Sequence, residues 1–515
     1  MTRCLLILGS LIVLSPPLDL AAQWWDAQLP RRGELQIGLT GENITVDQAF
    51  VDGIRQPLTE VYSTQLDARL IPALDTLNDL LGGLYPDLGL SQPEPSDLGA
   101  LQFDILYERT NAPISLNFGA TDWLSAFVVV PIVKSQSSVA RGLDSLSTVS
   151  GYSDSAFGGP NDNTLFEGLA AGIAELEDMV AADTLTPDQQ VEAERLLADA
   201  RTLEAGLIGL REGRFAPTNS GAPGQQLLQF YGALRSGFGT FEITLPGLSL
   251  ASPATVGAAI GEISWSALGI EPIQGRSSGI KFGDIETGLS LQPFNTFRER
   301  PDRPQPRFPI RLRLDGLYRF ATGAPSIATT LTDTGTGDGQ PDIELRSTFD
   351  VSFGRRVWLS LHLGYNIQMA AEVERLVTSP PYPIQPGAYA ALVRWNPGDV
   401  LTMVAAPRIN FARAFTFSGF FVRTQHGRDS VEPVTPIDEN ARFLPADLEE
   451  GTRFTATAIG FGARYSTTHW AGQRRSGLPL EVELRYLRTT SVADGLAPQQ
   501  NIWHVGLHYY QSIFR

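Results

Sequence analysis

The sequence predicts an all-β fold: a transmembrane up-and-down antiparallel β-barrel of about 12 strands with long extracellular loops. Three observations predict it. Short segments in the C-terminal two-thirds of the 515 residues alternate apolar and polar residues, aromatic residues recur near the ends of these segments, and no later stretch is long and apolar enough to span a bilayer as a helix. The length would allow two ordinary domains, but one barrel with insertions fits this pattern better.

Residues 309–320 show the alternation most clearly. Ile310, Leu312 and Leu314 share one face of an extended chain, and Arg311 and Arg313 share the other. A soluble β-sandwich also alternates, but here the polar face is crowded with charges that need partners or water. In an outer-membrane barrel the apolar residues face lipid and the polar residues face the lumen, so the pattern favours a barrel.

Twelve segments carry this two-residue period. With both chain ends in the periplasm, they give an up-and-down order with long outer loops and short inner turns. The segments lie near residues 33–40, 99–118, 123–134, 280–292, 308–321, 341–353, 357–369, 399–411, 414–425, 452–465, 479–490 and 501–514. The run 388–395 and a possible break at 111–113 could each add strands, so 12–14 strands are possible and an even total is expected.

Aromatic residues on the apolar face are expected to form two girdles at the membrane interfaces. The outer ends of the strands carry Tyr318, Phe320, Tyr365, Tyr486 and Trp503. The inner ends carry Phe353, Phe411, Phe415, Tyr465 and Tyr509. A soluble sandwich has no reason to place aromatic residues at both strand ends in step with strand direction.

Charged residues predominate on the opposite, lumen-facing side. This predicted charged wall comprises Asp284, Glu286, Arg311, Arg313, Asp315, Arg319, Glu344, Arg346, Asp350, Glu481, Glu483 and Arg485. Successive strands bring opposite charges side by side, where cross-strand pairing is favourable. Two interpretations remain open: a wall that selects what passes through a narrow pathway, and a salt-bridged plug that fills a small barrel.

The N-terminus has the form of a secretory signal peptide over residues 1–22, with Arg3, an apolar run to Leu14 and cleavage expected after Ala22. The sole cysteine, Cys4, lies inside this signal, so the mature chain has no thiol and suits an oxidising compartment. The net charge of −17 argues against a nucleic-acid partner. The mature chain, 23–515, is therefore expected in the bacterial outer membrane.

Two insertions, at about 41–98 and 135–279, interrupt the barrel pattern and lie on the extracellular side in this topology. The larger one contains a predicted helical hairpin at about 163–212, whose second helix begins with a capping box at Thr186. Residues 161–212 hold twelve Asp or Glu against three Arg, so the exposed faces of the hairpin are acidic. The hairpin could cover the barrel mouth, reach a partner, or simply decorate the rim.

The sequence shows no nucleophile elbow, no phosphate-binding glycine loop and no cysteine metal site, so it predicts no enzyme, no cofactor and no metal. His504 and His508 face the lumen, but on a strand they lie ~13 Å apart, too far to share one ion. The loop from Asp333 to Asp342 has glycines where a calcium loop needs ligands. We therefore expect it to be a flexible outer hairpin tip.

Several short motifs follow one another in order. They are Thr121–Pro131, Gly283–Gly288, Arg319–Gly323 with Gly335–Gly337, Pro341–Glu344, and Asn396–Asp399. They resemble elements of the outer-membrane β-barrel transporter-like proteins of the phenol-degradation meta-pathway family, which are similar to long-chain fatty-acid channels. The resemblance covers roughly 100–135 and 280–425, and the insertion at 135–279 is larger than the family pattern. It implies a monomeric barrel that passes small apolar or aromatic compounds.

The leading functional hypothesis is an outer-membrane channel for passive passage of small hydrophobic or aromatic compounds. Its expected partners are outer-membrane lipid, the barrel-insertion machinery during biogenesis and a small apolar solute. One alternative is a structural or adhesion barrel that presents the acidic hairpin. Another is a membrane-embedded hydrolase, since the chain has histidines at 362, 426, 469, 504 and 508.

Overall fold

The computed structural model describes residues 27–145, 148–182, 185–297, 306–354, 356–377, 384, 387–412, 414–435, 444–468 and 478–513. The predicted signal peptide, His469 and the last two residues lie outside these ranges. The chain forms two compact units. The barrel unit comprises residues 1–62, 104–140 and 268–515, and the helical unit comprises residues 63–103 and 141–267.

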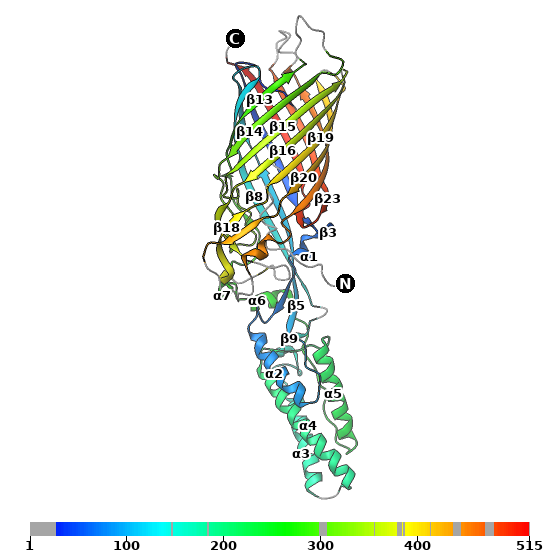
Figure 1. The fold of residues 1–515 in the computed structure, drawn as a ribbon. Helices are drawn as coiled ribbons and strands as arrows, with labels where there is room; N and C mark the ends of the chain where they lie inside the picture. Colours follow the sequence, from blue (N-terminus) through cyan, green and yellow to red (C-terminus); the bar gives the residue numbers. More distant parts are fainter. Residues whose placement is uncertain are drawn as a thin grey trace. The chain divides into compact units, whose positions relative to one another are not determined.

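Twelve strands form a closed antiparallel ring in the barrel unit (Figure 1). In chain order they are β1 (Glu34–Val46), β6 (Ile114–Gly119), β7 (Leu124–Val130), β13 (Glu286–Asn295), β14 (Ile310–Arg319), β15 (Asp342–Phe353), β16 (Val357–Gln368), β19 (Val400–Asn410), β20 (Phe415–His426), β22 (Phe454–Ser466), β23 (Leu480–Ala493) and β25 (Asn501–Ser512). Each pairs with the next, and β25 pairs with β1, where Ile37 lies opposite Tyr509. The predicted up-and-down barrel of twelve strands is confirmed.

Two prolines interrupt the strands that leave the ring. β5 (Asp97–Asn111) and β6 are separated at Pro113, and β7 and β8 (Ile132–Asp144) are separated at Pro131. Proline lacks the N–H group that a ladder hydrogen bond needs, so each strand bends or stops there. β5 and β8 continue along the chain from the barrel unit into the helical unit.

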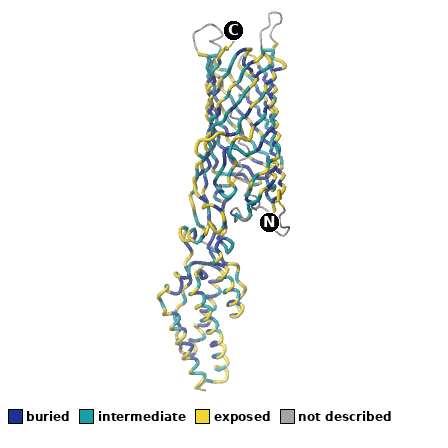
Figure 2. The backbone as a smooth tube through the Cα atoms, turned by 90° about the vertical axis from the view of Figure 1, so that its left-hand side faces the viewer, coloured by how far each residue is buried: buried dark blue, intermediate teal, exposed yellow. Residues whose placement is uncertain are grey.

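Burial alternates along the barrel strands, as Figure 2 shows. On β16, Leu361 and Leu363 are 43% and 49% exposed on the outer surface, whereas Ser360 and His362, which alternate with them, are buried in the interior. Apolar outward residues and polar inward residues are the reverse of a water-soluble barrel with an apolar core. The outer surface of the ring is therefore built to face an apolar medium.

The longer connections of the barrel unit contain small sheets of their own. β17 (Ala371–Leu376), β18 (Ala390–Asn396) and β21 (Ser430–Pro433) form one, with a core of Val377, Val393, Trp395, Val431 and Leu448. The run that could have added barrel strands is β18, which pairs outside the ring. A second sheet joins β2 (Gln48–Val51), β3 (Ile54–Pro57) and β24 (Leu496–Pro498). The barrel unit also contains the short helix α1 (Leu58–Val61) and the two-residue strands β11 (Arg276–Ser277) and β12 (Lys281–Phe282).

Helices dominate the other unit. They are α2 (Ala73–Asp87), α3 (Thr164–Ala181), α4 (Pro187–Glu212), α5 (Ala222–Gly239), α6 (Val256–Glu262) and α7 (Trp265–Leu268), beside the short strands β4 (Thr64–Asp67), β9 (Ser150–Tyr152) and β10 (Phe215–Pro217). Leu196, Leu203 and Leu207 bury one face of α4. The Thr186 hydroxyl accepts a hydrogen bond from the Gln189 N–H at 3.3 Å, which completes the capping box.

Charge is divided very unequally between the two units. The helical unit carries 22 Asp and Glu against 7 Arg and no Lys, a net charge of −15 out of −17 for the chain. The barrel unit is therefore nearly neutral. Within the described ranges, none of the helices has both the length and the apolar character needed to cross a membrane.

Candidate functional site

The inward face of the barrel is the candidate functional site, because it gathers the charged residues singled out in the sequence. Eleven of the twelve predicted wall residues lie on barrel strands with their side chains inward and largely buried. The exception is Asp284, which precedes β13 and accepts a hydrogen bond from the Gly323 N–H at 2.8 Å. Asp284 thus holds a loop at the end of the barrel rather than forming part of the wall.

One cluster of ion pairs surrounds Arg319 near the loop end of β14. The guanidinium lies 2.9 Å from Glu286 on β13, 2.9 Å from Asp342 on β15, and 3.8 Å from Glu344. Three carboxylates on the two neighbouring strands therefore share one buried cation. Glu344 also pairs with Arg346 on its own strand at 2.5 Å.

Other wall residues pair along a strand instead of across it. Arg313 lies 2.8 Å from Asp315, and Arg485 contacts Glu483 and the His504 ring, the latter at 2.8 Å. Residues two apart on one strand share a face and lie ~7 Å apart along the backbone, so a long arginine side chain can fold back onto its neighbour. Alternation predicts which residues face inward, but it does not distinguish these two kinds of pairing.

Asp350 is the centre of a cluster near the short-turn end of the barrel. Its carboxylate lies 2.6 Å from Arg311 Nε and 3.1 Å from Arg408 Nη2, and it accepts the Ser360 hydroxyl and the Ala27 N–H. The Asp350 side chain is completely buried. The part played by Arg408 was not predicted from the sequence, although its inward position on β19 follows from the same alternation.

The N-terminal segment Ala27–Pro30 lies inside the barrel. Ala27 and Leu29 are buried, the Gln292 amide donates to the Ala27 carbonyl, and Arg311 donates to the Gln28 amide oxygen at 3.4 Å. No sequence pattern pointed to this placement, because residues 27–30 show neither alternation nor a helical period. The segment occupies space that an open channel would leave to solvent.

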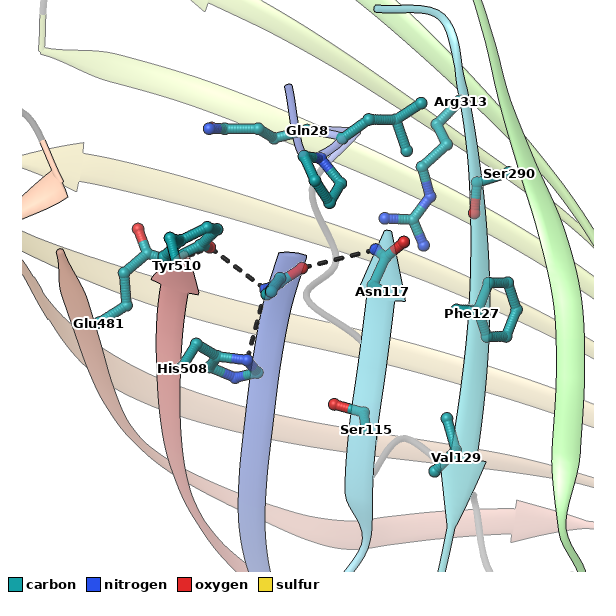
Figure 3. A pocket seen from close by; sticks show the side chains of 13 residues that line it. Gln28, Ser115, Asn117, Phe127, Val129, Ser290, Arg313, Glu481, His508 and Tyr510 are labelled. Carbon is teal, nitrogen blue, oxygen red and sulfur yellow. Dashed lines mark hydrogen bonds between the residues drawn. The ribbon is translucent and has the colours of Figure 1, made fainter. Parts of the chain in front are cut away.

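A polar cavity of about 60 Å³ adjoins this segment (Figure 3). Gln28, Leu29 and Pro30 line one part, and Arg313, Glu481 and His508 line others. The Gln36 amide on β1 links side chains of the two neighbouring strands. It donates to the Tyr510 hydroxyl on β25 at 3.2 Å, lies 3.4 Å from His508 Nδ1, and accepts from the Asn117 amide on β6 at 3.5 Å. The cavity has room for water but not for a larger molecule.

Another stretch of the inner wall is apolar. Val404 on β19, Val422 on β20 and Ala458 on β22 face each other in register, and all three are buried. Phe420 and Leu487 extend this apolar stretch along the neighbouring positions. The interior therefore presents charged residues on β13, β14 and β15 and an apolar patch at these positions of β19, β20, β22 and β23, which was not predicted from the sequence.

The loop 320–341 packs into the barrel unit at the long-loop end, and we call it the mouth loop. Thr332, Thr336 and Gln340 on it are almost completely buried. Ser135 and Ser137 on β8 donate to the Gly335 and Thr332 carbonyls at 2.9 and 3.1 Å. The loop connects the paired strands β14 and β15, as expected of a hairpin tip, but these threonine and serine contacts pack it against β8, so it is not an exposed turn.

The small sheet formed by β17, β18 and β21 also holds the mouth loop. The Gln340 amide donates to the Trp395 carbonyl at 3.2 Å, and Arg375 donates to the Ser326 hydroxyl at 3.3 Å. Burial lowers the pKa of Arg375 to about 10, while the carboxylates of Asp338 and Asp429 act in the raising direction. The arginine therefore remains charged at neutral pH. Its guanidinium carbon lies 4.4 Å from the centroid of the Trp395 ring, a distance that suits a cation–π contact.

Replacing Thr336 by valine should loosen the mouth loop. The Thr336 hydroxyl accepts from the Ala324 N–H and donates to the Phe282 carbonyl, both at 3.0 Å. Valine keeps the shape but leaves the part-buried Ala324 N–H and Phe282 carbonyl without this partner, at a cost of about 1 kcal/mol. We expect faster amide hydrogen exchange across 324–337 than in a Thr329→Val control, and equal exchange in the two variants would contradict this role for the hydroxyl.

The predicted interface aromatics all lie on the outer surface of the ring, exposed or half-exposed. Several meet in pairs: Tyr318 with Phe320 and Tyr486 with Trp503, each with ring centroids 4.8 Å apart, and Phe415 with Tyr465 at 4.9 Å. Among the described residues there is no group of three or more His, Cys, Asp or Glu side chains placed to hold a metal ion.

No family model matches the sequence, and no curated protein matches it. Solved structures do align with it. The COG4313 outer membrane channel from Pseudomonas putida F1 aligns over 95% of this chain and 99% of its own, with 9% identity and a TM-score of 0.42. The Ralstonia pickettii toluene transporter TbuX aligns over 95% and 90%, with 10% identity and a TM-score of 0.27. A Pseudomonas aeruginosa FadL homologue aligns over 93% and 90%, with 8% identity and a TM-score of 0.26.

At these scores the alignments carry no residue assignments. The fold of this chain is established by its own closed ring of twelve antiparallel strands.

Proposed function

We propose that the protein is an outer-membrane channel for the passive passage of small hydrophobic or aromatic compounds. The observation that carries the proposal is the closed ring, which turns apolar and aromatic side chains outward and encloses a polar and charged interior. That distribution suits a barrel surrounded by outer-membrane lipid. One of the solved structures that align with the chain is named as a toluene transporter, a protein for a solute of this class.

The same proposal assigns sides to the barrel. β1 begins and β25 ends at the short-turn end, which we place in the periplasm, and the insertions 41–98 and 135–279 then belong to the extracellular side. The ring closes within one chain, so we propose a monomer. The barrel-insertion machinery would assemble it during biogenesis.

Transport requires movement inside the barrel. The cavity of about 60 Å³ beside Ala27–Pro30 is smaller than the roughly 150 Å³ apolar cavity that binds benzene in an engineered protein. A ring-sized solute that passes beside Ala27–Pro30, which we call the lumen segment, would therefore have to displace it. The charged clusters at Arg319 and Asp350 would then line the pathway, the first of the two interpretations of the wall.

Liposome efflux tests the proposal. Benzenesulfonate is a suitable aromatic probe because its permanent charge keeps it from crossing lipid unaided. We expect faster efflux from liposomes that contain the protein than from empty liposomes, and slower efflux of glucose through the same barrels. A variant with residues 324–337 replaced by a short Gly-Ser linker should raise the benzenesulfonate rate. Efflux equal to that of empty liposomes for both the wild type and this variant would exclude the channel function.

A further inference from the structure

Two aromatic side chains stack inside the barrel near the short-turn end. Phe297 follows β13, and Trp358 is the second residue of β16. Their ring centroids lie 4.6 Å apart and their planes differ by only 11°. Trp358 lies on the inward face of β16, in register with the buried residues Ser352 and Arg408 on the neighbouring strands. Both rings are half-buried, so the stack borders the interior and is not part of a sealed core.

Two guanidinium groups flank this stack. Arg311 lies 5.3 Å from the centroid of the Phe297 ring and 5.7 Å from that of Trp358, and Arg408 lies 5.8 Å from Trp358. Both arginines bind the Asp350 carboxylate, so two cations share one anion and the cluster keeps a net positive charge beside the rings. The site thus combines an aromatic face with the cations that hold a carboxylate.

The Trp358 indole N–H has no acceptor among the described residues, although it is shielded from solvent. Buried tryptophan N–H groups usually find a hydrogen-bond partner, so a purely structural stack leaves this donor unexplained. A ligand with an oxygen at the edge of its ring would supply the acceptor. Phe297, which comes from the connection between two strands, covers the Trp358 face in the way that a ligand ring would.

We propose that the face of Trp358 now covered by Phe297 is a binding site for the ring of an aromatic acid, and that Phe297 covers this face when no ligand is bound. This inference rests on the proposed channel function, for which it names a substrate class. The solute ring takes the place of Phe297 on the indole, and its carboxylate or sulfonate lies beside Arg311 and Arg408. Stacking favours a flat aromatic ring over a saturated ring of the same size and charge.

The test is equilibrium binding to the full chain in detergent micelles, measured by saturation-transfer NMR with benzenesulfonate and cyclohexanesulfonate. We expect benzenesulfonate to bind about threefold to tenfold more tightly. Trp358→Leu should remove this preference. Phe297→Leu should strengthen benzenesulfonate binding by a similar factor, because it removes the competing ring. A purely structural stack predicts no such gain.

Phe415→Leu provides a control, since it breaks the tilted aromatic pair with Tyr465 on the outer surface and should leave both affinities unchanged. Equal binding of the two sulfonates by the wild type, or a weaker benzenesulfonate affinity in Phe297→Leu, would overturn the inference. Such a result beside normal benzenesulfonate efflux would leave the channel function standing. An aromatic preference without efflux would instead support the site and exclude the channel.

Discussion

Asp350→Ala is expected to cause the largest loss of stability of any single inward substitution, about 3–5 kcal/mol of unfolding free energy. The buried carboxylate compensates Arg311 and Arg408 and accepts the Ala27 N–H at 2.9 Å. Alanine would leave two buried guanidinium groups without that anion and would release the lumen segment. Denaturant titration in lipid vesicles measures the stability, and planar-bilayer recording should show a higher conductance.

Two variants make this prediction specific. Asp350→Asn keeps an oxygen acceptor for Ala27 but removes the charge, so its stability should lie between those of the wild type and Asp350→Ala. Asp104 on β5 is exposed, and Asp104→Ala should change stability by less than about 0.5 kcal/mol. If Asp350→Ala behaved like Asp104→Ala, the cluster would not hold the segment in place.

Leu363→Arg is expected to be the second most costly change, about 2–4 kcal/mol in a bilayer. Leu363 is 49% exposed on the outer surface, near the middle of β16. A charge there would sit in hydrocarbon if the barrel spans a membrane, as proposed. Denaturant titration in phospholipid vesicles should show the loss.

Val191→Arg is the matched control for this prediction. Val191 is also an exposed apolar residue, 69% exposed, but it lies on α4 in the helical unit. Arginine at this position should cost less than about 0.5 kcal/mol. Equal, small effects at Leu363 and Val191 would contradict a lipid-facing outer surface.

The barrel was predictable from sequence because alternate residues of each strand face lipid and lumen. Apolar residues therefore point outward and polar residues inward with a two-residue period. On β16 every second residue from Leu359 to Ile367 is apolar, and the pattern survives because lipid and lumen impose opposite demands on alternate positions. The inward direction of Arg311, Arg313 and Arg319 followed from the same period. Their partners did not, because an arginine can reach either across or along a strand.

Irregular segments were not predictable in the same way. The lumen position of Ala27–Pro30 depends on contacts with Asp350, Gln292 and Arg311, which are remote in sequence. The mouth loop is rich in Gly and Thr, a composition that also describes exposed turns, and only its hydrogen bonds to β8 show that it is packed. Phe297 gave no periodic signal because it lies in a connection between strands.

The lumen segment also constrains how the molecule can assemble. It lies immediately before β1, and β1 pairs both with β6 and with β25, so residues near 34 and near 512 must meet to close the ring. Such distant pairing is expected to form late, after the strands between have already joined. The segment would then be enclosed as the last seam forms, with no need to thread into a finished barrel. Mutations that weaken the β1–β25 seam should therefore slow the final folding step more than those in the β15–β16 hairpin.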